Sequence, residues 1–195
     1  MVVRQLSEDA HVWLGELPRR ERPGVDALWA LHPERFHRIS IMGRERPVPR
    51  WSRAYGRDYA YSGRVDAAQP VPALLEPVLR WFREQVSPAL NGLLVNWYDG
   101  AQGHYIGKHR DSVKGLLEGE PIVTLSLGES RCFRLRPYTR GGRGRAGGRV
   151  DIEVGHGVFV VIPWATNQRF THEVPRRAAD RGRRISVTLR AFEED

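Results

Sequence analysis

The residues from Leu93 to Asp111 end in His109-Arg110-Asp111, the triplet of this chain with the clearest potential for chemistry. In an extended strand, His109 and Asp111 would point to the same side, with their Cβ atoms roughly 6–7 Å apart. An imidazole and a carboxylate at that spacing can bind one metal ion. With a second imidazole from elsewhere in the chain, they form the facial triad of non-haem iron oxygenases. An H-x-D triplet alone has little specificity, because most such triplets are structural or face solvent.

The C-terminal third supplies the partners that such a triplet needs. His172 is a candidate third ligand, and Arg184 and Arg190 follow it. The last strand alternates strictly, which predicts one polar face made of Arg184, Ser186, Thr188 and Arg190. Two guanidinium groups beside two hydroxyls suit a dicarboxylate, because guanidinium binds carboxylates in a planar, two-pronged way. An exposed surface strand would show the same alternation.

Asn96 and Tyr98 share one face of the strand that leads towards His109, and both side chains can donate hydrogen bonds to a carboxylate. His156, in a Gly-His-Gly turn, is the competing candidate for a metal ligand. The sequence thus contains an ordered series of chemically suitable residues, namely Asn96, Tyr98, His109, Asp111, His172, Arg184 and Arg190.

Length and composition predict one folded domain over residues 1–195. Hydrophobic residues make up 41% of the chain, and six tryptophans suit a packed core. No apolar run approaches the length of a membrane span, so we expect no membrane partner and a cytoplasmic location. We also expect a monomer. A single cysteine, Cys132, excludes an internal disulfide and a thiolate zinc cluster.

The net charge of +8, with a pI near 10.3, favours a phosphate-bearing partner. Arginine-rich composition that merely reflects the source genome is the alternative. Residues 139–149 contain arginines spaced by glycines, a low-complexity stretch that predicts a flexible hairpin tip. Such a tip could follow a phosphate backbone or lie in solvent with no partner.

The periodicity of the chain predicts a mainly β fold with flanking helices. Helical spacing of apolar residues over 72–90 predicts a helix that covers the outside of a sheet. Many short strands between Gly- and Pro-containing turns indicate a two-sheet jelly roll, or double-stranded β-helix. We expect these strands at 92–98, 121–127, 131–136, 149–154, 157–162, 170–174 and 183–191.

Residues 1–91 form, in this interpretation, an α/β extension for nucleotide recognition, and residues 92–192 the catalytic core. Alternating residues over 36–42 predict a strand, and an extended run over 46–51 completes a hairpin with Met42 near its tip. An exposed Met there could enter a base stack, although a core methionine is the more common use. Tyr59 and Tyr61 share a face if extended and could stack on a base or pack on a sheet.

The sequence resembles the AlkB family of Fe(II)- and 2-oxoglutarate-dependent nucleic-acid demethylases. The resemblance covers roughly residues 36–192. Its motifs are Asn96-x-Tyr98, His109-x-Asp111, the run from Pro121 to Gly128, Gly155-His156-Gly157, His172-x-x-Pro175, and the strand from Arg184 to Arg190.

The resemblance implies that His109, Asp111 and His172 bind Fe(II), with molecular oxygen as the other reactant. It implies that Arg184 and Tyr98 hold the distal carboxylate of 2-oxoglutarate. Arg190 and Asn96 would then lie near its iron-chelating end, with Ser186 and Thr188 lining the same cleft.

The upstream segment is similar to the branch of the family that acts on duplex DNA. This similarity implies that Met42 fills the gap left by an extruded base and that Tyr61 stacks on that base. The other implied nucleic-acid contacts are Arg50, Tyr59, Arg110, Arg176 and Arg177. Val113 departs from the family pattern, which has an acidic residue two positions after the metal-binding aspartate. The preferred base therefore stays open.

The main hypothesis is an oxidative demethylase of alkylated DNA, single- or double-stranded, with RNA as a further possible substrate. The first alternative keeps the chemistry but acts on a small metabolite or a protein. The second is a jelly-roll module that binds nucleic acid without catalysis. A zinc hydrolase could use the same three ligands, but it gives no reason for Arg184 and Arg190.

Overall fold

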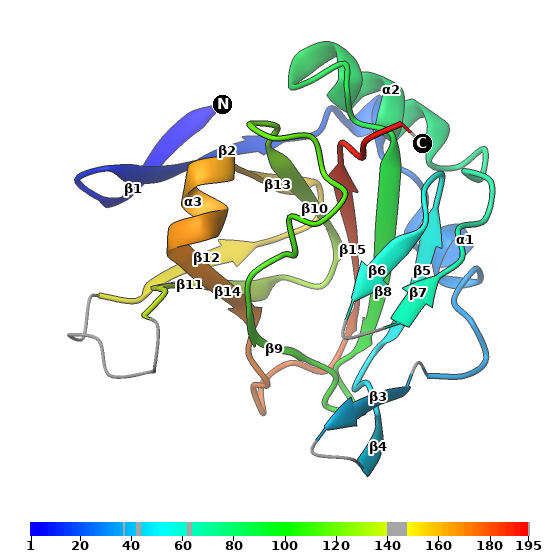
Figure 1. The fold of residues 1–195 in the computed structure, drawn as a ribbon. Coiled ribbons are helices and arrows are strands. Elements are labelled where there is room, and N and C mark those ends of the chain that lie inside the picture. The colour runs from blue at the N-terminus through cyan, green and yellow to red at the C-terminus, as the bar shows by residue number, and fades with distance from the viewer. Residues whose placement is uncertain (37, 42–43, 62–63, 140–147, 195) are drawn as a thin grey trace.

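The structure is a computed structural model that describes residues 1–36, 38–41, 44–61, 64–139 and 148–194 (Figure 1). The side chains of residues 39–41, 44–45, 60–61 and 64 fall outside this description. Met42 and most of the glycine- and arginine-rich stretch at 139–149 also fall outside it.

Two antiparallel sheets form the body of the molecule (Figure 1). In spatial order, the seven-stranded sheet contains β1 (Val2–Ser7), β2 (Ala10–Glu16), β13 (Val158–Ile162), β10 (Ile122–Gly128), β15 (Arg183–Arg190), β8 (Gly92–Asp99) and β5 (Trp51–Tyr55). The four-stranded sheet contains β12 (Val150–Val154), β11 (Arg131–Pro137), β14 (Phe170–Val174) and β9 (Ile106–His109). The mainly β, jelly-roll class predicted from the sequence is confirmed, and the seven strands expected after residue 91 differ from the observed bounds by at most one residue at either end.

The two faces of the seven-stranded sheet pack against different elements: helices cover the outer face, and the four-stranded sheet covers the inner face. On the outer face, Ile185, Val187 and Leu189 of β15 pack in a core with the helices α1 (Val25–Trp29) and α2 (Glu76–Gln85). On the inner face, a second apolar core joins this sheet to the four-stranded one, for example through Val160 and Phe133. The polar face of β15 therefore looks into the space between the sheets, as the period of two requires.

Helix α2 covers the outer face as predicted, but it is shorter than the expected 72–90. Phe82 of this helix lies edge-on to Phe159 of the sheet, with ring centroids 5.1 Å apart. The helix begins at Glu76 and has Pro77 in its first turn, because proline fits the first turn of a helix but not its interior. Pro88 disfavours helical backbone at the residue before it, which fits the helix end at Gln85.

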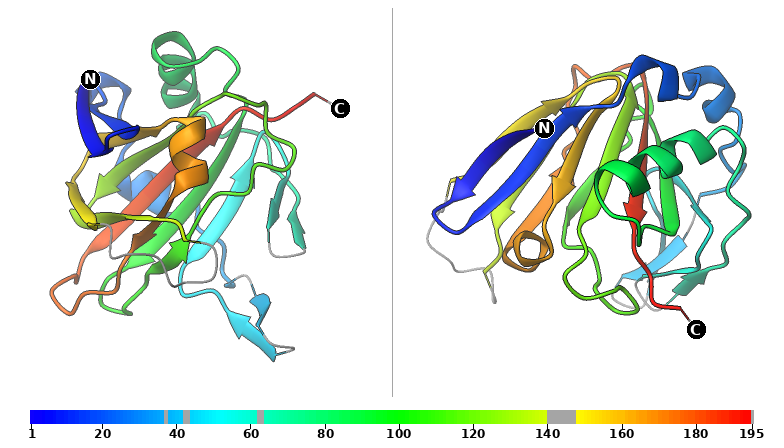
Figure 2. Two further views of the ribbon diagram at one scale, coloured as in Figure 1. Left: turned by 60° about the vertical axis from the view of Figure 1, so that its left-hand side comes forward. Right: turned by 90° about the horizontal axis from the view of Figure 1, so that it is seen from above.

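Two small hairpins lie outside the two large sheets, the first at the end of the molecule opposite α2 and the second between that end and α2 (Figures 1 and 2). They are β3 (Arg38–Ile41) with β4 (Arg44–Pro47), and β6 (Tyr59–Tyr61) with β7 (Arg64–Asp66). The first hairpin agrees with the sequence, but the extended run expected to continue to Trp51 is interrupted after Pro47. Bends at Pro49 and Arg50 separate β4 from β5.

The remaining short elements are a 3-10 turn at Arg19–Glu21 and the helix α3 (Trp164–Arg169), which connects β13 to β14. Strands β1, β2 and β5 come from residues 1–91 yet belong to the same sheet as the later strands. The division into an extension and a core stays a prediction. Among the described residues, none of the helices has the length and apolarity needed to cross a bilayer.

Candidate functional site

Two neighbouring strands of the smaller sheet bring the predicted metal ligands together. His109 at the end of β9 and His172 in β14 are direct cross-strand partners, and their ring centroids lie 4.3 Å apart. Oδ1 of Asp111 lies 3.5 Å from Nε2 of His109 and 3.7 Å from Nε2 of His172. The three ligand atoms all lie within 4.8 Å of one another. Side chains 63 residues apart in the chain therefore converge on one point.

The backbone around Asp111 differs from the prediction. Strand β9 ends at His109, so Arg110 and Asp111 are not part of a strand. The shared direction of His109 and Asp111 does not come from strand alternation at Asp111. It comes instead from the contacts that hold Asp111 in place after the chain leaves the sheet.

The Asp111 carboxylate is held by Arg190, the last residue of β15. Nη2 and Nε of Arg190 donate to Oδ2 of Asp111 at 2.6 and 3.1 Å, and both residues are buried. Burial alone raises the pKa of Asp111, but Arg190 and the two imidazoles outweigh it and hold the pKa well below its usual range. The carboxylate is therefore ionised, with Oδ2 engaged by Arg190 and Oδ1 facing the histidines.

Both imidazoles can present a free Nε2 lone pair. Nδ1 of His109 lies 2.8 Å from the carbonyl oxygen of Gly107, which only accepts, so the proton is on Nδ1. Burial and then the neighbouring His109 lower the pKa of His172 to about 3, so this imidazole is neutral near pH 7. Phe133 stacks on the His172 ring at 5.4 Å and fixes its plane.

The polar face of β15 is buried from Arg184 to Arg190, which rules out the exposed-strand interpretation of its alternation. Arg184 is 1% exposed, its Nε donates to Oγ of Ser126 at 2.9 Å, and the Tyr98 ring lies 4.9 Å from its Cζ. Its Nη1 is buried with no hydrogen-bond partner among the described residues. Burial is the largest influence on the pKa of Arg184 and lowers it, with Arg131 adding to the effect and Tyr98 and Asp180 opposing it.

A buried guanidinium with an unused donor can bind an anion, because burying an unpaired charge is costly. Ser186 and Thr188 lie between Arg184 and Arg190 on the same strand face, and Asn96 and Tyr98 lie on the neighbouring β8. Asn96 accepts a hydrogen bond from Nε of Arg50 at 2.8 Å.

One cavity of about 1240 Å³ contains all of these groups. Its described lining includes the three candidate metal ligands and the predicted cosubstrate residues. Positive charge predominates in this lining: the basic residues are Arg46, Arg50, Lys108, Arg110, Lys114, Arg184 and Arg190, and the only acidic residue is Asp111. Since Asp111 is already paired with Arg190, the rest of the cavity favours anions.

The predicted nucleic-acid contacts divide into three groups. Arg50, Tyr59 and Arg110 line the cavity, and Cζ of Arg190 lies 4.7 Å from the centre of the Tyr59 ring. Arg176 and Arg177 do not line it. Met42 and the side chain of Tyr61 lie outside the described residues, so their roles stay predictions.

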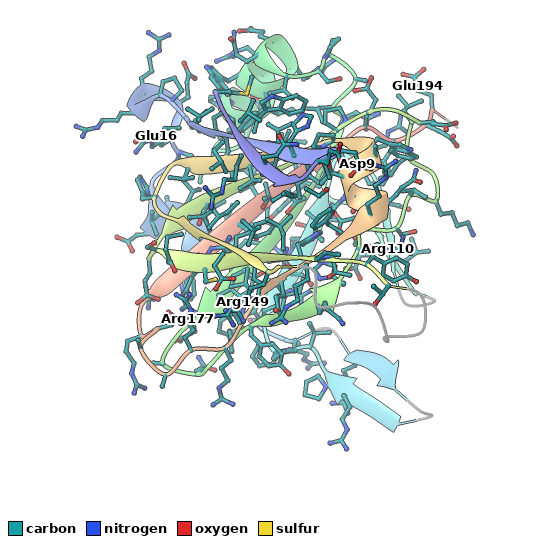
Figure 3. All side chains as sticks on the ribbon, turned by 90° about the vertical axis from the view of Figure 1, so that its left-hand side faces the viewer. Asp9, Glu16, Arg110, Arg149, Arg177 and Glu194 are labelled. Atoms are coloured by element: carbon teal, nitrogen blue, oxygen red, sulfur yellow. The ribbon has the colours of Figure 1, made fainter. Side chains whose placement is uncertain are left out.

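Arg177 forms an ion pair with Glu153 at 2.7 Å, whereas Arg176 lies against Gly103. Figure 3 shows Arg177 beside Arg149 at the edge of the smaller sheet, with Arg110 on a separate part of the surface. The competing candidate His156 is not part of the ligand cluster among the described residues. Its Nδ1 instead accepts a hydrogen bond from the Gly128 amide at 3.2 Å.

Two residues at the site were missed by the sequence interpretation. Ser126 orients Arg184 by accepting its Nε hydrogen bond, and Asn167 contacts the backbone of Asp111. An asparagine in a short helix far from the triplet carries no local sequence signal for such a role. Ser126 does stand on an apolar strand next to β15, and a polar residue there could have been noticed.

The residues of the cavity fit an iron ion with 2-oxoglutarate. Two imidazoles and one ionised carboxylate are the donor set of non-haem Fe(II) oxygenases and leave positions open for other ligands. The unpartnered Nη1 of Arg184 offers a donor to a second anionic group in the same cavity. Two acidic functions of one small molecule can therefore be bound in the same cavity, one at the metal ion and one at Arg184.

Comparisons with known proteins agree with this chemistry. Residues 31–190 match the model of the 2OG-Fe(II) oxygenase superfamily, whose cofactors are Fe(II), 2-oxoglutarate and oxygen. The chain is 32% identical over 164 residues to the DNA oxidative demethylase ALKBH2 of Bos taurus, covering 78% of this chain and 56% of that protein. It is 31% identical to ALKBH2 of Homo sapiens, covering 78% of this chain and 60% of that protein.

It is also 32% identical over 158 residues to the alpha-ketoglutarate-dependent dioxygenase alkB homolog 3 of Rattus norvegicus, covering 76% of this chain and 52% of that protein. The chain thus spans little more than half the length of several curated relatives. The solved structure of OsALKBH1 shares the fold, with a TM-score of 0.57 and 15% sequence identity over 98% of this chain and 100% of that chain. On the family model, the ligand set and these relatives together, the chain belongs to the AlkB family within the 2OG-Fe(II) oxygenase superfamily.

Proposed function

We propose that this protein is an Fe(II)- and 2-oxoglutarate-dependent dioxygenase that removes alkyl groups from damaged bases in DNA. The observation that carries the proposal is the convergence of His109, Asp111 and His172 in the same cavity as the unpartnered Nη1 of Arg184. A metal site alone would suit several chemistries. A metal site that shares its cavity with a buried anion-binding arginine favours a metal-chelating dicarboxylate.

Bound iron would supply oxygen activation, in which 2-oxoglutarate and O2 give succinate and carbon dioxide while the second oxygen atom hydroxylates the N-alkyl carbon of the base. The hydroxylated adduct then breaks its C–N bond and releases an aldehyde, which leaves the unmodified base. Oxygen is the oxidant, and the keto acid supplies the other two electrons.

The side chains of this protein bind and orient the reactants. Arg184, backed by Tyr98 and by Ser126, would donate to the distal carboxylate of the keto acid. Arg190 keeps Asp111 ionised and turns Oδ1 towards the histidines. Such pre-set geometry lowers the reorganisation needed during the reaction.

The excess of basic residues in the cavity lining supports a polyanionic substrate, since lysine and arginine side chains neutralise backbone phosphates. Arg50 and Tyr59 line the cavity, which supports a contact between these side chains and a nucleotide that enters it. A base within a duplex would have to rotate out of the stack, which costs least for a damaged, poorly paired base. The names of the ALKBH2 relatives describe DNA oxidative demethylases, which supports DNA as the substrate here.

The test is turnover of alkylated oligonucleotides by the iron-reconstituted protein, with succinate and aldehyde measured together. We expect equal amounts of both products with at least one N-alkyl lesion in a panel of single-stranded, duplex and RNA substrates. Unmodified oligonucleotides of the same sequence are the control. Succinate release that no nucleic acid alters would favour a metabolite or protein hydroxylase, and an absence of turnover on every lesion would defeat the repair function. The monomeric state and cytoplasmic location stay predictions of the sequence.

A further inference from the structure

Asp111 is the one of the three candidate metal ligands whose backbone lies outside the sheets. His109 is the last residue of β9 and His172 lies within β14, where the two strands pair with each other. Asp111 follows two positions after the end of β9. It is nevertheless buried, with 6% of its surface exposed. Buried backbone groups outside a sheet ladder need other partners.

The side chain of Asn167 supplies these partners. Its Oδ1 accepts a hydrogen bond from the Asp111 amide at 3.2 Å, and its Nδ2 donates to the Asp111 carbonyl at 3.1 Å. One carboxamide thus pairs with both backbone groups of a single residue, much as a neighbouring strand would. Asn167 is 2% exposed, so water does not compete for these hydrogen bonds.

Asp111 is consequently held from two sides by two different elements. Helix α3 holds its backbone through Asn167, and β15 holds Oδ2 through Arg190. With both contacts made, Oδ1 is the carboxylate oxygen that faces the two histidines. Rotation of the side chain would break the Arg190 contact, and displacement of the backbone would break the Asn167 contact.

Asn167 also connects Asp111 to His172, because it contacts the Asp111 backbone and lies in the helix that leads into the strand of His172. It precedes His172 by five residues, and α3 runs directly into β14. The helix is anchored elsewhere, because Oγ1 of Thr166 donates to the carbonyl of His11 in β2 at 2.8 Å. Arg110 donates to the Gln168 carbonyl at 2.9 Å, which adds a second tie between the two segments.

We propose that Asn167 is a positioning residue for the metal site: it fixes the Asp111 backbone so that Oδ1 meets the two imidazoles before any metal arrives. This inference rests on the metal site of the proposed function. Its consequence is that loss of the Asn167 amide lowers metal affinity while all three ligands remain. Partners that orient metal ligands typically contribute about 10–100-fold to metal affinity.

The chain offers a matched control for this role. Asn91 makes the same pair of contacts with another backbone, since its Nδ2 donates to the Phe192 carbonyl at 2.9 Å and its Oδ1 accepts from the Phe192 amide at 2.8 Å. Asn91 is absent from the described lining of the cavity. Asn91→Ala therefore removes an equivalent two-bond contact without touching a metal ligand.

The experiment is a titration of residues 1–195 with Mn(II), which replaces Fe(II) because it is not oxidised under the assay conditions. Calorimetry and electron paramagnetic resonance measure the binding. We expect Asn167→Ala to bind Mn(II) about 10–100-fold more weakly than wild type, and Asn91→Ala to match wild type. Asn167→Ser, which keeps one donor and acceptor, should fall between them. Chemical unfolding without metal measures the stability lost by each variant, so that a general loss of folding is recognised.

Wild-type affinity in a folded Asn167→Ala would overturn the positioning role and leave the proposed function intact. Equal losses of metal affinity in Asn167→Ala and Asn91→Ala would also overturn it, because the effect would then follow stability alone. If Asn167→Ala does not fold, the affinity of Asn167→Ser decides by the same comparison. A wild-type protein that binds no Mn(II) would instead contradict the metal site itself, and with it the proposed function.

Discussion

The inner end of the cavity and its mouth differ in how their charged side chains are held: they are buried at the inner end and exposed at the mouth. At the inner end, Asp111, His172, Arg184 and Arg190 are nine-tenths or more buried, and strands of two sheets hold most of them. At the mouth, Lys108, Arg110 and Lys114 of the same lining are exposed to solvent. The inner end is specified by fixed pairings, and the mouth by the local density of positive charge.

This difference predicts how each region responds to change. A buried polar group that loses its partner carries the full cost of desolvation, so single substitutions at the inner end should have large effects. Exposed charges act through a field that salt screens, so single substitutions at the mouth should have small effects that depend on ionic strength.

His172→Ala should cause the largest loss. Removing one of three metal ligands should weaken Mn(II) binding by more than the roughly 10–100-fold attributed to an outer-sphere partner. Calorimetric titration and product assays measure both consequences. His156→Ala is the control, because His156 is not part of the described ligand cluster. Equal effects of the two substitutions would show that the ligand assignment is wrong.

Arg184→Met should weaken 2-oxoglutarate binding roughly 10–100-fold, since a hydrogen bond to a charged group contributes about 1.5–3 kcal/mol. Metal affinity in the absence of the keto acid should stay near that of wild type, which titration with Mn(II) alone can establish. The neighbouring Arg183 is exposed and lies over the Trp29 ring at 4.9 Å, so Arg183→Met is the matched control. Unchanged keto-acid affinity in Arg184→Met would remove the anion-binding role.

At the mouth, the double substitution Lys108→Ala with Lys114→Ala should lower DNA affinity several-fold. Because each phosphate contact contributes about −0.9 to the slope of log affinity against log salt on duplex DNA, this slope should become shallower by up to about 2. Fluorescence anisotropy at several salt concentrations measures it. Arg20→Ala, an exposed arginine outside the cavity lining, should leave the slope unchanged.

The smallest expected effect is a difference in DNA affinity between substitutions of Arg176 and Arg177. The charge of Arg177 is partly neutralised by Glu153 at 2.7 Å, so Arg177→Ala should reduce DNA affinity less than Arg176→Ala. The same anisotropy assay at low salt resolves the pair. A larger loss for Arg177 would mean that its ion pair with Glu153 opens when DNA binds.

The sequence predicted well whatever depends on local periodicity. The seven strands expected after residue 91 and the shared side of Arg184, Ser186, Thr188 and Arg190 on β15 follow from alternation and from turn residues between short apolar runs. Alternation alone did not decide whether that side of β15 is buried or exposed. The helix over 72–90 was predicted too long because apolar spacing continues past positions where proline prevents helical backbone. Apolar periodicity alone does not account for the steric effect of proline on helical backbone.

Contacts between distant segments were harder to predict. The sequence placed Arg190 near the chelating end of the keto acid, and the structure shows its guanidinium on the Asp111 carboxylate. The direction of Asp111 was attributed to a strand that ends two residues earlier, and the part of Asn167 in it has no signature in the chain. Such pairings depend on tertiary packing, which spacing along one chain does not encode.

The central claim is that Fe(II) and 2-oxoglutarate bind together in this cavity, and absorption spectroscopy can measure this directly. Titrating the anaerobic Fe(II) protein with 2-oxoglutarate should produce the visible charge-transfer absorption of an Fe(II)–keto acid chelate. We predict that this absorption appears in wild type, is absent in His172→Ala, and requires a higher concentration of 2-oxoglutarate in Arg184→Met. An absorption that saturates equally in all three proteins would contradict the assignment of this site.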